Sequence, residues 1–445
     1  MKYSVLSNVI SWIFPTRTER KLFRKFCTGI DERILCEKQR EIIYRRYPKT
    51  VEKLKKEVKI RQLNVVFLCT ENSKWSYQSL YEELEKHENF NPQILITLPE
   101  PMFLKKHSYD FIDNKRFLIE NYEFFKSKGM NVDYAFDFEK DKYIDLKEFK
   151  PDIIFYEQPW DISEVQSIWK TSEFALCCHC SYGTSITTAT YEFNAPFYRY
   201  LYKYFLDNEF IHDSYVNVYD YNSENVPVTG SLKLDAYRLS LDINNIKWKT
   251  ECKKRVIWAP HHSFSKDSIL KYGTFDRNYN FFLDFAKNHP EIEFILKPHP
   301  MLKHQILEKK LMNKEQMDDY FTQWENLPNA QIIEGGNYFD MFRTSDMLIT
   351  DSCSFLSEYL PLGKPVIHLI SNSSSGLNGF GNKITQGYYK ALNLNDLKRY
   401  IDEVLINNND TLKDLRIKSY QECFNSEGQT SAFRIVNHLK NLFNI

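Results

Sequence analysis

Short runs of apolar residues alternate with helix-like stretches along the first half of the chain. The runs that are typical of buried strands cover residues 64–69, 92–98, 152–156 and 174–178, and further strands are expected at 217–219 and 226–230. The helix-like stretches cover residues 75–84, 114–128 and 191–206. Strands that are apolar on both faces are typical of a parallel sheet with helices on each side. The pattern predicts a Rossmann-like α/β domain over residues 61–240.

The same alternation returns after a polar stretch at 240–254, which we interpret as a linker. Strands are predicted at 255–260, 292–297, 330–333, 347–350 and 366–369, and helices at 278–288, 303–324 and 338–344. A chain of 445 residues is too long for one ordinary core. We therefore predict a second Rossmann-like domain over residues 250–427, a cleft between the two domains, and a C-terminal helix over residues 428–445.

The first 60 residues differ from the rest of the chain in charge. They contain 16 Lys and Arg against 7 Asp and Glu, whereas the whole chain carries 59 of each kind. Val5, Val9 and Ile13 recur at helical spacing ahead of the basic residues, and a charged helix broken near Pro48 is expected over residues 31–59. This basic helical arm (residues 1–60) suits an anionic membrane surface, or packing on its own domain with a solvated basic face. Both interpretations stay open.

Several classes of protein lack support in the composition. The formal net charge is zero, so a nucleic-acid partner is not expected. The nine cysteines are scattered as in a protein of the reducing cytoplasm, and no run of about twenty apolar residues predicts a membrane span. Neither a P-loop nor a Gly-x-Gly-x-x-Gly motif follows the first strand, which argues against kinases, ATPases and dehydrogenases. We expect a cytoplasmic protein without a cofactor, either free or peripheral on the inner face of the membrane.

Reactive side chains follow one strand of the second domain in a Lys-Pro-His-Pro motif. Lys297 and His299 both lie at the carboxyl end of this strand. His299 is held between two prolines and titrates near neutral pH, so it suits a contact with phosphate. A loop histidine that only caps a strand end is the alternative. Because ligands bind at the carboxyl ends of parallel strands, we expect both side chains to line a ligand cleft.

A second strand end carries candidate binding residues. Asp351, Ser352 and Ser354 follow the predicted strand at 347–350 and offer a side-chain cap and free amides at a helix start. Such a turn suits a pyrophosphate, although an ordinary helix cap has the same composition. Glu358 lies one turn further on. Its carboxylate is predicted to accept the hydroxyls of a ribose, and the alternative is a solvated helix residue.

A third strand end carries a pair of histidines. His261, His262 and Ser263 follow the first strand of the second domain and are predicted to reach phosphate or an acceptor. No carboxylate cluster accompanies the two histidines, so a metal site is not predicted. The sequence Cys-Cys-His-Cys at 177–180 is not predicted to bind zinc either, because adjacent side chains of a strand point to opposite faces.

These motifs resemble those of the CDP-glycerol glycerophosphotransferases of teichoic-acid and capsule synthesis, which have the two-domain GT-B fold. The resemblance covers roughly residues 170–370 and rests mainly on residues 297–300, 345–354 and 363–367. It implies that His299 contacts the phosphates of the nucleotide donor and that His179, in Cys-His-Cys-Ser-Tyr-Gly, is the general base. It also implies that the nucleotide side of the donor is held by Thr350, Asp351 and Ser354.

The resemblance implies a metal-independent transferase of the cell envelope. It would move a glycerophosphate-like or glycosyl group from a cytidine-nucleotide donor to a polysaccharide, teichoic-acid-type or lipid-linked acceptor. A CMP- or UDP-sugar-dependent glycosyltransferase of capsule or lipopolysaccharide synthesis is an alternative, because Lys-Pro-His-Pro also resembles a motif of bacterial sialyltransferases and capsule Kdo transferases. A UDP-sugar epimerase and a non-catalytic binding protein on the same fold are the remaining alternatives.

Overall fold

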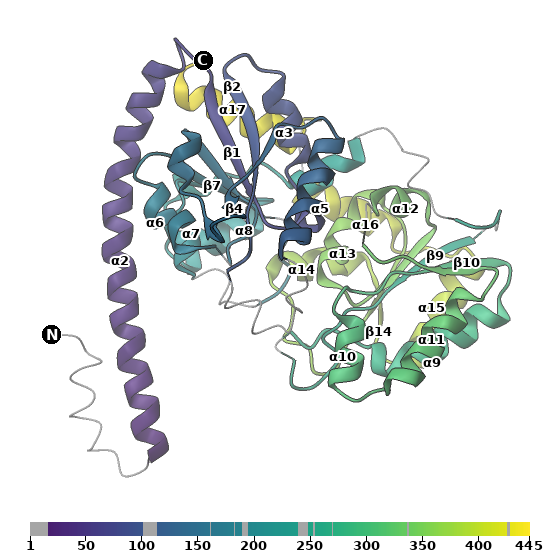
Figure 1. Cartoon of the computed structure of the whole chain (residues 1–445). Coiled ribbons are helices and arrows are strands. Elements are labelled where there is room, and N and C mark those ends of the chain that lie inside the picture. Colours follow the sequence, from purple (N-terminus) through teal and green to yellow (C-terminus); the bar gives the residue numbers. More distant parts are fainter. Residues whose placement is uncertain are drawn as a thin grey trace.

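Two six-stranded parallel sheets organise the molecule (Figure 1). The computed structural model describes residues 17–100, 114–160, 162–181, 183–188, 195–238, 248–251, 254–268, 270–335, 338–424 and 428–445. Each sheet is flanked by helices, and the two halves lie side by side. This is the tandem Rossmann-like architecture of the GT-B fold, as the apolar pattern predicts. The predicted residue boundaries of the two domains, of the arm and of the C-terminal helix stay predictions.

The first sheet has the strand order β3-β2-β1-β6-β7-β8. Its strands are β1 (Leu63–Cys69), β2 (Phe90–Ile96), β3 (Val132–Tyr134), β6 (Ile153–Tyr156), β7 (Leu176–Cys180) and β8 (Lys203–Phe205). The helices of this half are α3 (Gln78–Glu85), α5 (Asn114–Ser127), α6 (Ile168–Thr171), α7 (Pro196–Tyr200) and α8 (Glu209–Asp213), and β4 (Phe136–Asp137) pairs with β5 (Lys142–Tyr143). Every residue of β6 and β7 is buried, which explains why these strands are apolar apart from His179 in β7.

The second sheet repeats this order as β11-β10-β9-β12-β13-β14. Its strands are β9 (Lys254–Ala259), β10 (Ile292–Leu296), β11 (Ala330–Ile332), β12 (Met347–Thr350), β13 (Val366–Leu369) and β14 (Tyr389–Ala391). Its helices are α9 (Phe275–Asn288), α10 (Leu302–Glu308), α11 (Lys314–Glu325), α12 (Phe339–Thr344), α13 (Cys353–Glu358), α14 (Gly379–Ile384), α15 (Leu394–Tyr400) and α16 (Lys413–Cys423). In both sheets the strand order reverses beside the first strand, so β1/β6 and β9/β12 flank the switch points at which such sheets bind ligands.

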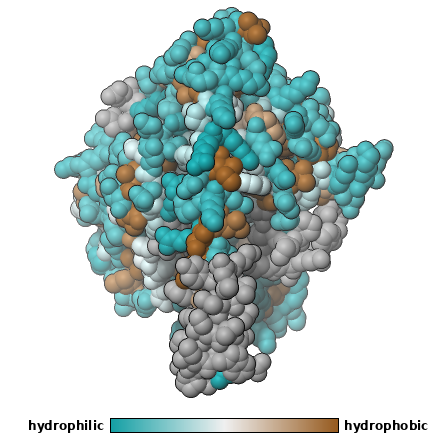
Figure 2. Space-filling model, turned by 90° about the vertical axis from the view of Figure 1, so that its left-hand side faces the viewer, coloured by the Kyte–Doolittle hydropathy of each residue, from teal (hydrophilic) through white to brown (hydrophobic). Residues whose placement is uncertain are grey.

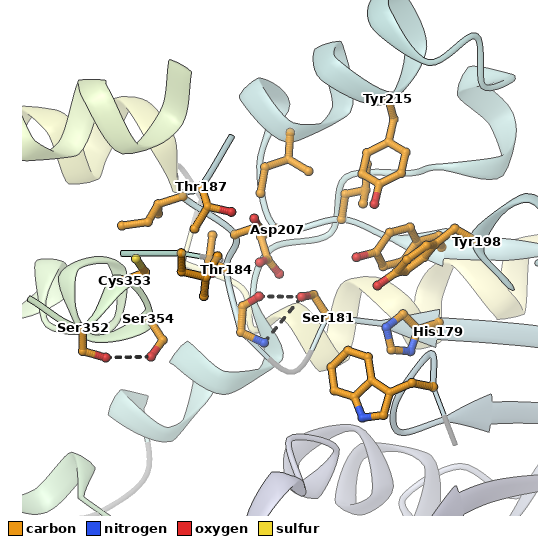
Figure 3. A pocket seen from close by; sticks show the side chains of 18 of the residues that line it. His179, Ser181, Thr184, Thr187, Tyr198, Asp207, Tyr215, Ser352, Cys353 and Ser354 are labelled. Atoms are coloured by element: carbon orange, nitrogen blue, oxygen red, sulfur yellow. Dashed lines mark hydrogen bonds between the residues drawn. The ribbon is translucent and has the colours of Figure 1, made fainter. Parts of the chain in front are cut away.

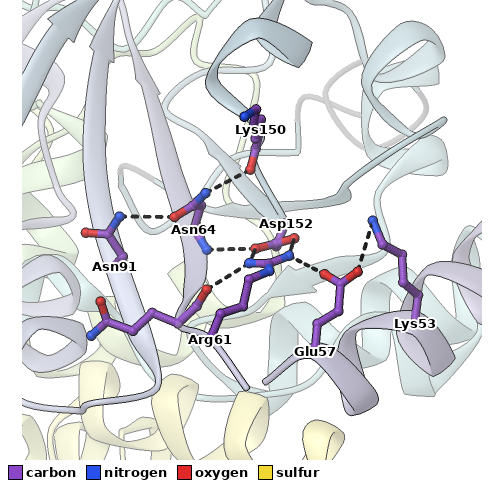
Figure 4. Close-up of polar contacts among 8 residues, drawn as sticks. Lys53, Glu57, Arg61, Asn64, Asn91, Lys150 and Asp152 are labelled. Atoms are coloured by element: carbon purple, nitrogen blue, oxygen red, sulfur yellow. Dashed lines mark hydrogen bonds and ion pairs between the residues drawn. The ribbon is translucent and has the colours of Figure 1, made fainter. Parts of the chain in front are cut away.

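The 41-residue helix α2 (Arg17–Glu57) runs along the outside of the first half (Figure 1). Its C-terminal part is fixed by polar contacts that Figure 4 shows. Arg61, just beyond the helix, pairs with Asp152 at 2.6 Å and also with Glu57, and Asp152 accepts a hydrogen bond from Asn64 N at 2.8 Å. Tyr47 packs against the same half and donates to the carbonyl of Tyr200 at 2.6 Å. The helix is therefore anchored at its C-terminal end.

The part of the molecule beside α2 is mainly hydrophilic in Figure 2, with scattered hydrophobic side chains. Ile34, Leu35 and Ile42 are the large apolar residues of α2 that are exposed to solvent, among those that the structure describes. No helix in the described ranges is both long and apolar enough to cross a membrane. The apolar residues that precede the basic stretch, from Val5 to Ile13, lie outside the described residues.

The last helix of the chain, α17 (Ser431–Phe443), returns to the first half and packs on α3 and α2 (Figure 1). Ile435, Leu439 and Phe443 are fully buried in the core of that half. The carboxylate of Asp235 accepts the amides of Ser431 and Ala432 at 2.8 and 2.9 Å and so fixes the start of the helix. The C-terminal end of the chain thus completes the N-terminal half.

Five local predictions are wrong. The helix α2 runs through Pro48 instead of breaking there. Residues 214–218 form a short helical turn instead of a strand at 217–219, and residues 226–230 contribute only an isolated bridge between Leu206 and Val228. The strand β8 lies within the stretch at 191–206 that is predicted to be helical. The predicted helix at 303–324 is two helices, α10 and α11.

Candidate functional site

The switch point of the second sheet brings two predicted site residues together. His261 follows β9, and Asp351 follows β12, the neighbouring strand. The amide of His261 donates to Asp351 Oδ1 at 2.6 Å, and Thr274 donates to Oδ2 through its amide and its hydroxyl at 2.6 and 2.7 Å. Burial raises the pKa of Asp351 to about 6 even though these hydrogen bonds favour the charged form. Asp351 thus holds the loop after β9 in place.

Two other predicted binding residues also hold backbone. Thr350 is fully buried, donates to the carbonyl of Ala259 at 2.6 Å and accepts the amide of Ser352 at 2.9 Å. The hydroxyl of Ser263 lies 2.7 Å from His261 Nδ1 and accepts the amide of Tyr272 at 3.0 Å. Neither side chain lines the cavity described below. These contacts shape the strand ends on which the histidines stand.

Three imidazole rings from two strand ends are packed together. The ring centroid of His262 lies 4.2 Å from that of His261 and 4.1 Å from that of His299. One nitrogen from each ring lies within 4.8 Å of the others, a spacing that brings them near a common metal ion. The sequence predicts no metal site at these histidines, and this cluster is the place in the described part of the chain where metal binding can be tested.

The hydrogen bonds of the rings indicate which nitrogens carry protons. The backbone amide of Met301 donates to His299 Nδ1 at 3.1 Å, so Nδ1 is unprotonated and the proton of the neutral ring is on Nε2. His261 Nδ1 is likewise occupied by the hydroxyl and the amide of Ser263. A metal-bound histidine normally donates its other ring N–H. The arrangement therefore favours Nε2–H groups that donate to a ligand over nitrogens that bind a metal.

Burial keeps this histidine cluster neutral in the absence of a ligand. It lowers the pKa of His299 to about 3, with a further contribution from His262, and it lowers the pKa of His262 to about 4. It also lowers the pKa of His261 well below its ordinary value. A neutral imidazole is a hydrogen-bond donor and acceptor but brings no charge of its own. An anion bound here would stabilise the protonated rings.

A cavity of about 250 Å³ lies between the two halves. Figure 3 shows the serines at the start of α13 on one side, His179 and Tyr198 on the other, and Asp207 with Thr184 between them. The second half contributes His261, His299, Ser352, Cys353 and Ser354, and the first half contributes most of the remaining lining, including Trp160, His179, Thr184, Tyr198, Tyr204, Asp207 and Tyr215. Both sheets therefore present their strand ends to one cavity.

His179 belongs to the first-half wall and differs from His299 in the position of its proton. Its Nδ1 donates to the carbonyl of Tyr156 at 2.7 Å, so the lone pair of the neutral ring is on Nε2. Burial lowers the pKa of His179 to about 4. The ring packs against Tyr204, with 5.2 Å between the centroids. His179 is thus placed as a neutral acceptor on the wall opposite the Nε2–H group of His299.

Asp207 lines the cavity and was missed in the sequence analysis. It follows β8, is only 4% exposed, and its Oδ2 has no hydrogen-bond partner within the described part of the chain. Burial raises the pKa of Asp207 to about 7, and the negative charge of Glu358 adds to this effect. In the sequence, Asp207 precedes an Asn-Glu pair at a helix start, so it looks like part of an ordinary cap.

Two predicted binding residues lie behind the cavity. Glu358 is 1% exposed, and its carboxylate accepts the hydroxyl of Tyr338 at 2.5 Å and pairs with Lys233 of the first half at 2.9 Å. Lys297 is 5% exposed and donates to the carbonyl of Gly335 at 3.0 Å. Burial lowers the pKa of Lys297 to about 8. Neither group touches the cavity in the arrangement observed.

The structure therefore divides the predicted site residues into two sets. The cavity is lined by His179, His261, His299, Ser352 and Ser354, whereas the residues that pack around it are His262, Ser263, Lys297, Thr350, Asp351 and Glu358. The roles assigned to all of them, catalytic or ligand-binding, stay predictions.

Comparison with known proteins finds similar folds among solved structures. The sequence matches no protein-family model and no curated protein sequence. The structure is similar to the Staphylococcus aureus MnaA–UDP complex, with a TM-score of 0.57, 15% identity and coverage of 86% of this chain and 97% of the other. It is similar to UDP-GlcNAc 2-epimerase from Neisseria meningitidis bound to UDP-GlcNAc, with a TM-score of 0.55, 16% identity and coverage of 85% and 100%.

A third similar structure is a putative UDP-N-acetylglucosamine 2-epimerase from Listeria monocytogenes, with a TM-score of 0.55, 14% identity and coverage of 86% and 97%. At these identities the likeness shows a shared fold. The similarity to these epimerase structures overturns the resemblance to CDP-glycerol glycerophosphotransferases. The prediction of a transferase with a cytidine-nucleotide donor, which this resemblance implies, is therefore wrong. The physical reason is that Thr350 and Asp351, which carry much of that resemblance, hold loops of the fold and do not line the cavity.

Proposed function

We propose that the protein is an enzyme that binds a UDP-sugar in the cavity between its two halves and epimerises the sugar. The observation that carries this proposal is the cavity itself, which joins the strand ends of both sheets in a fold similar to structures of UDP-GlcNAc 2-epimerases. Ligands of parallel α/β sheets bind at such switch points. The UDP and UDP-GlcNAc in two of the similar structures identify the class of ligand to test first.

The second-half wall suits the diphosphate of such a ligand. The Nε2–H groups of His261 and His299 are donors, and Ser352 and Ser354 add hydroxyl groups to the same wall. Hydrogen bonds from these groups to a phosphate are charge-assisted and therefore stronger than those between neutral groups. The first-half wall carries the buried acid Asp207 instead, which repels an anion when it is ionised. The charges of the cavity thus favour one orientation of a UDP-sugar.

Epimerisation requires a proton or another group to leave and return at a sugar carbon, so acid–base groups are needed beside the sugar. His179 supplies a neutral acceptor and Asp207 a carboxyl that titrates near neutral pH, and both line the same cavity. These groups support a reaction that needs no second substrate. A transferase would in addition need room for an acceptor.

The proposal is tested by incubating the protein with UDP-GlcNAc alone and following the sugar by proton NMR. We expect a second UDP-sugar to appear without any acceptor. Conversion that depends on an added acceptor would contradict epimerisation, and failure to bind any UDP-sugar would contradict the whole proposal. The same assay with ADP-, GDP- and CMP-linked sugars reports the preference for uridine.

The variant His299→Ala tests the diphosphate wall. Because one charge-assisted hydrogen bond is lost, we expect UDP to bind roughly ten- to a hundredfold more weakly by calorimetry. His304→Ala is the matched control, since His304 lies on α10 of the same half, is half exposed and does not line the cavity. Equal affinities for the two variants would remove His299 from the binding site.

A further inference from the structure

The two walls of the cavity differ in chemistry as well as in charge. Trp160, Tyr198 and Tyr204 line the first-half wall, whereas the second-half wall consists of imidazole and small side chains together with Leu270. Aromatic rings offer large flat apolar surfaces with polar edges. A sugar ring presents apolar C–H faces and peripheral hydroxyl groups, so the first-half wall fits the sugar better than it fits a phosphate.

Asp207 is the acidic group of this wall, and it has unused hydrogen-bonding capacity. The side chain is 4% exposed, and the hydroxyls of Thr184 and Ser231 stabilise its carboxylate form. Its Oδ2 still has no hydrogen-bond partner in the ranges that the structure covers. A buried polar atom without a partner is costly, so native proteins seldom leave one unless a ligand or water completes it. Figure 3 shows Asp207 in the middle of the cavity lining.

We propose that Asp207 binds the sugar of the UDP-sugar, with Oδ2 paired to one of its hydroxyl groups, and so determines which sugars the cavity accepts. This inference rests on the function proposed above. A hydroxyl group suits Oδ2 better than the diphosphate does, because an ionised Asp207 repels an anion and the nearby cation, Lys233, is already paired with Glu358.

The pairing is compatible with both charge states of the carboxyl. Burial and the charge of Glu358 raise the pKa of Asp207 to about 7, while Lys233 and the hydroxyls of Thr184 and Ser231 act in the opposite direction. The thiol of Cys180 is also near enough to this carboxyl to interact with it electrostatically. The ionised form accepts a hydrogen bond from a hydroxyl, and the neutral form also donates one. The strength of sugar binding is therefore expected to change across neutral pH.

The test compares the affinities of UDP and UDP-GlcNAc by calorimetry for the wild type, Asp207→Ala and Asp207→Asn. We expect Asp207→Ala to weaken UDP-GlcNAc by roughly tenfold or more and to leave UDP unchanged, because only the sugar loses a partner. Asp207→Asn is expected to remove the change in UDP-GlcNAc affinity between pH 6 and pH 8. Glu209→Gln, which removes a nearby exposed carboxyl, is the control and should change neither ligand.

The outcomes separate this inference from the proposed function. If the wild type binds UDP and UDP-GlcNAc but both Asp207 variants bind them with unchanged affinity, Asp207 does not hold the sugar although the proposed function stands. Equal weakening of both ligands in the variants would also overturn the inference, because the effect would then not be specific to the sugar. If the wild type binds neither ligand, the proposed function fails and the inference fails with it. Should Asp207→Ala not fold, the pH dependence of Asp207→Asn decides.

Discussion

Burial governs the charge of the individual side chains in the cavity. The same desolvation lowers the pKa of His299 to about 3 and raises that of Asp207 to about 7, so it favours the neutral form of both. The two groups differ in what the neutral form can do. His299 donates through Nε2, whereas Asp207 both donates and accepts. The histidines of the second-half wall are therefore neutral before a ligand binds, so the diphosphate brings the dominant charge to that wall.

Asp207→Asn should change the pH dependence of stability. A carboxyl whose pKa is raised on folding contributes stability that is present below its unfolded pKa of about 3.8 and is lost as the pH rises through about 7. The amide variant does not titrate. We therefore expect the melting temperature of Asp207→Asn, relative to that of the wild type, to increase between pH 5 and pH 8 in thermal-shift measurements. A difference that is constant over this range would mean that Asp207 titrates normally.

Single residues of the site were predictable only where the sequence around them is unusual. The two prolines beside His299 mark a rigid strand end, and the cavity does contain this histidine. Asp207 has no such mark, because the next residue, Asn208, is a true helix cap that accepts the amide of Ile211 at 3.1 Å. What distinguishes Asp207 is its burial between the two halves, which only the tertiary structure supplies.

Strands were the most predictable elements because parallel strands are buried on both faces and read as short apolar runs. Both the start and the end of β12 and of β13 coincide with the prediction. Helix boundaries were harder to predict. The backbone of Lys310 has a φ of 54° just after α10, and Asn313 starts α11 with a capping box. Without a glycine at position 310, the sequence shows no break there.

The C-terminal helix α17 should contribute substantially to the stability of the first half. Leu439 is fully buried in the core of that half, so Leu439→Ala should lower the free energy of unfolding by about 2–5 kcal/mol. Asn441→Ala, on the exposed side of the same helix, is the control and should change it by less than about 0.5 kcal/mol. Urea denaturation followed by circular dichroism measures both. A small loss for Leu439→Ala would mean that the helix is only loosely attached.

At the scale of the whole molecule, a few contacts join the two halves behind the cavity. Lys233 and Tyr237 of the first half both contact Glu358, through the ion pair at 2.9 Å and a hydrogen bond to the backbone carbonyl at 2.7 Å. Tyr237 also packs edge-on against Phe339, with 4.9 Å between the ring centroids. Arg343 reaches back to the carbonyl of Ala236. These contacts fix how the two cavity walls face each other.

Removing only Lys233 from its ion pair with Glu358 should destabilise the protein more than removing both charges. Lys233→Met leaves the buried carboxylate of Glu358 without its cation, which should cost about 1–3 kcal/mol. The double variant Lys233→Met with Glu358→Gln removes the uncompensated charge and should recover part of this loss. Guanidinium denaturation of the single and double variants measures the coupling. A double variant that is no more stable than Lys233→Met alone would show that the pair is not coupled.

The fold was predictable from the sequence, whereas the resemblance drawn from the motifs was wrong. Polar residues at the ends of parallel strands mark the ligand edge in any doubly wound sheet. Thr350, Asp351 and His299 stand at such ends, and the first two hold loops together. Motifs of this kind therefore report the architecture more reliably than they report the nucleotide or the reaction.

The most direct test of the account is the crystal structure of the complex with UDP. We expect the diphosphate to lie within hydrogen-bonding distance of His299 Nε2, on the second-half wall, and the space beside Asp207 to remain for the sugar. UDP bound outside the cavity, or with its diphosphate against Asp207, would contradict the assignment of the two walls and with it the proposed function.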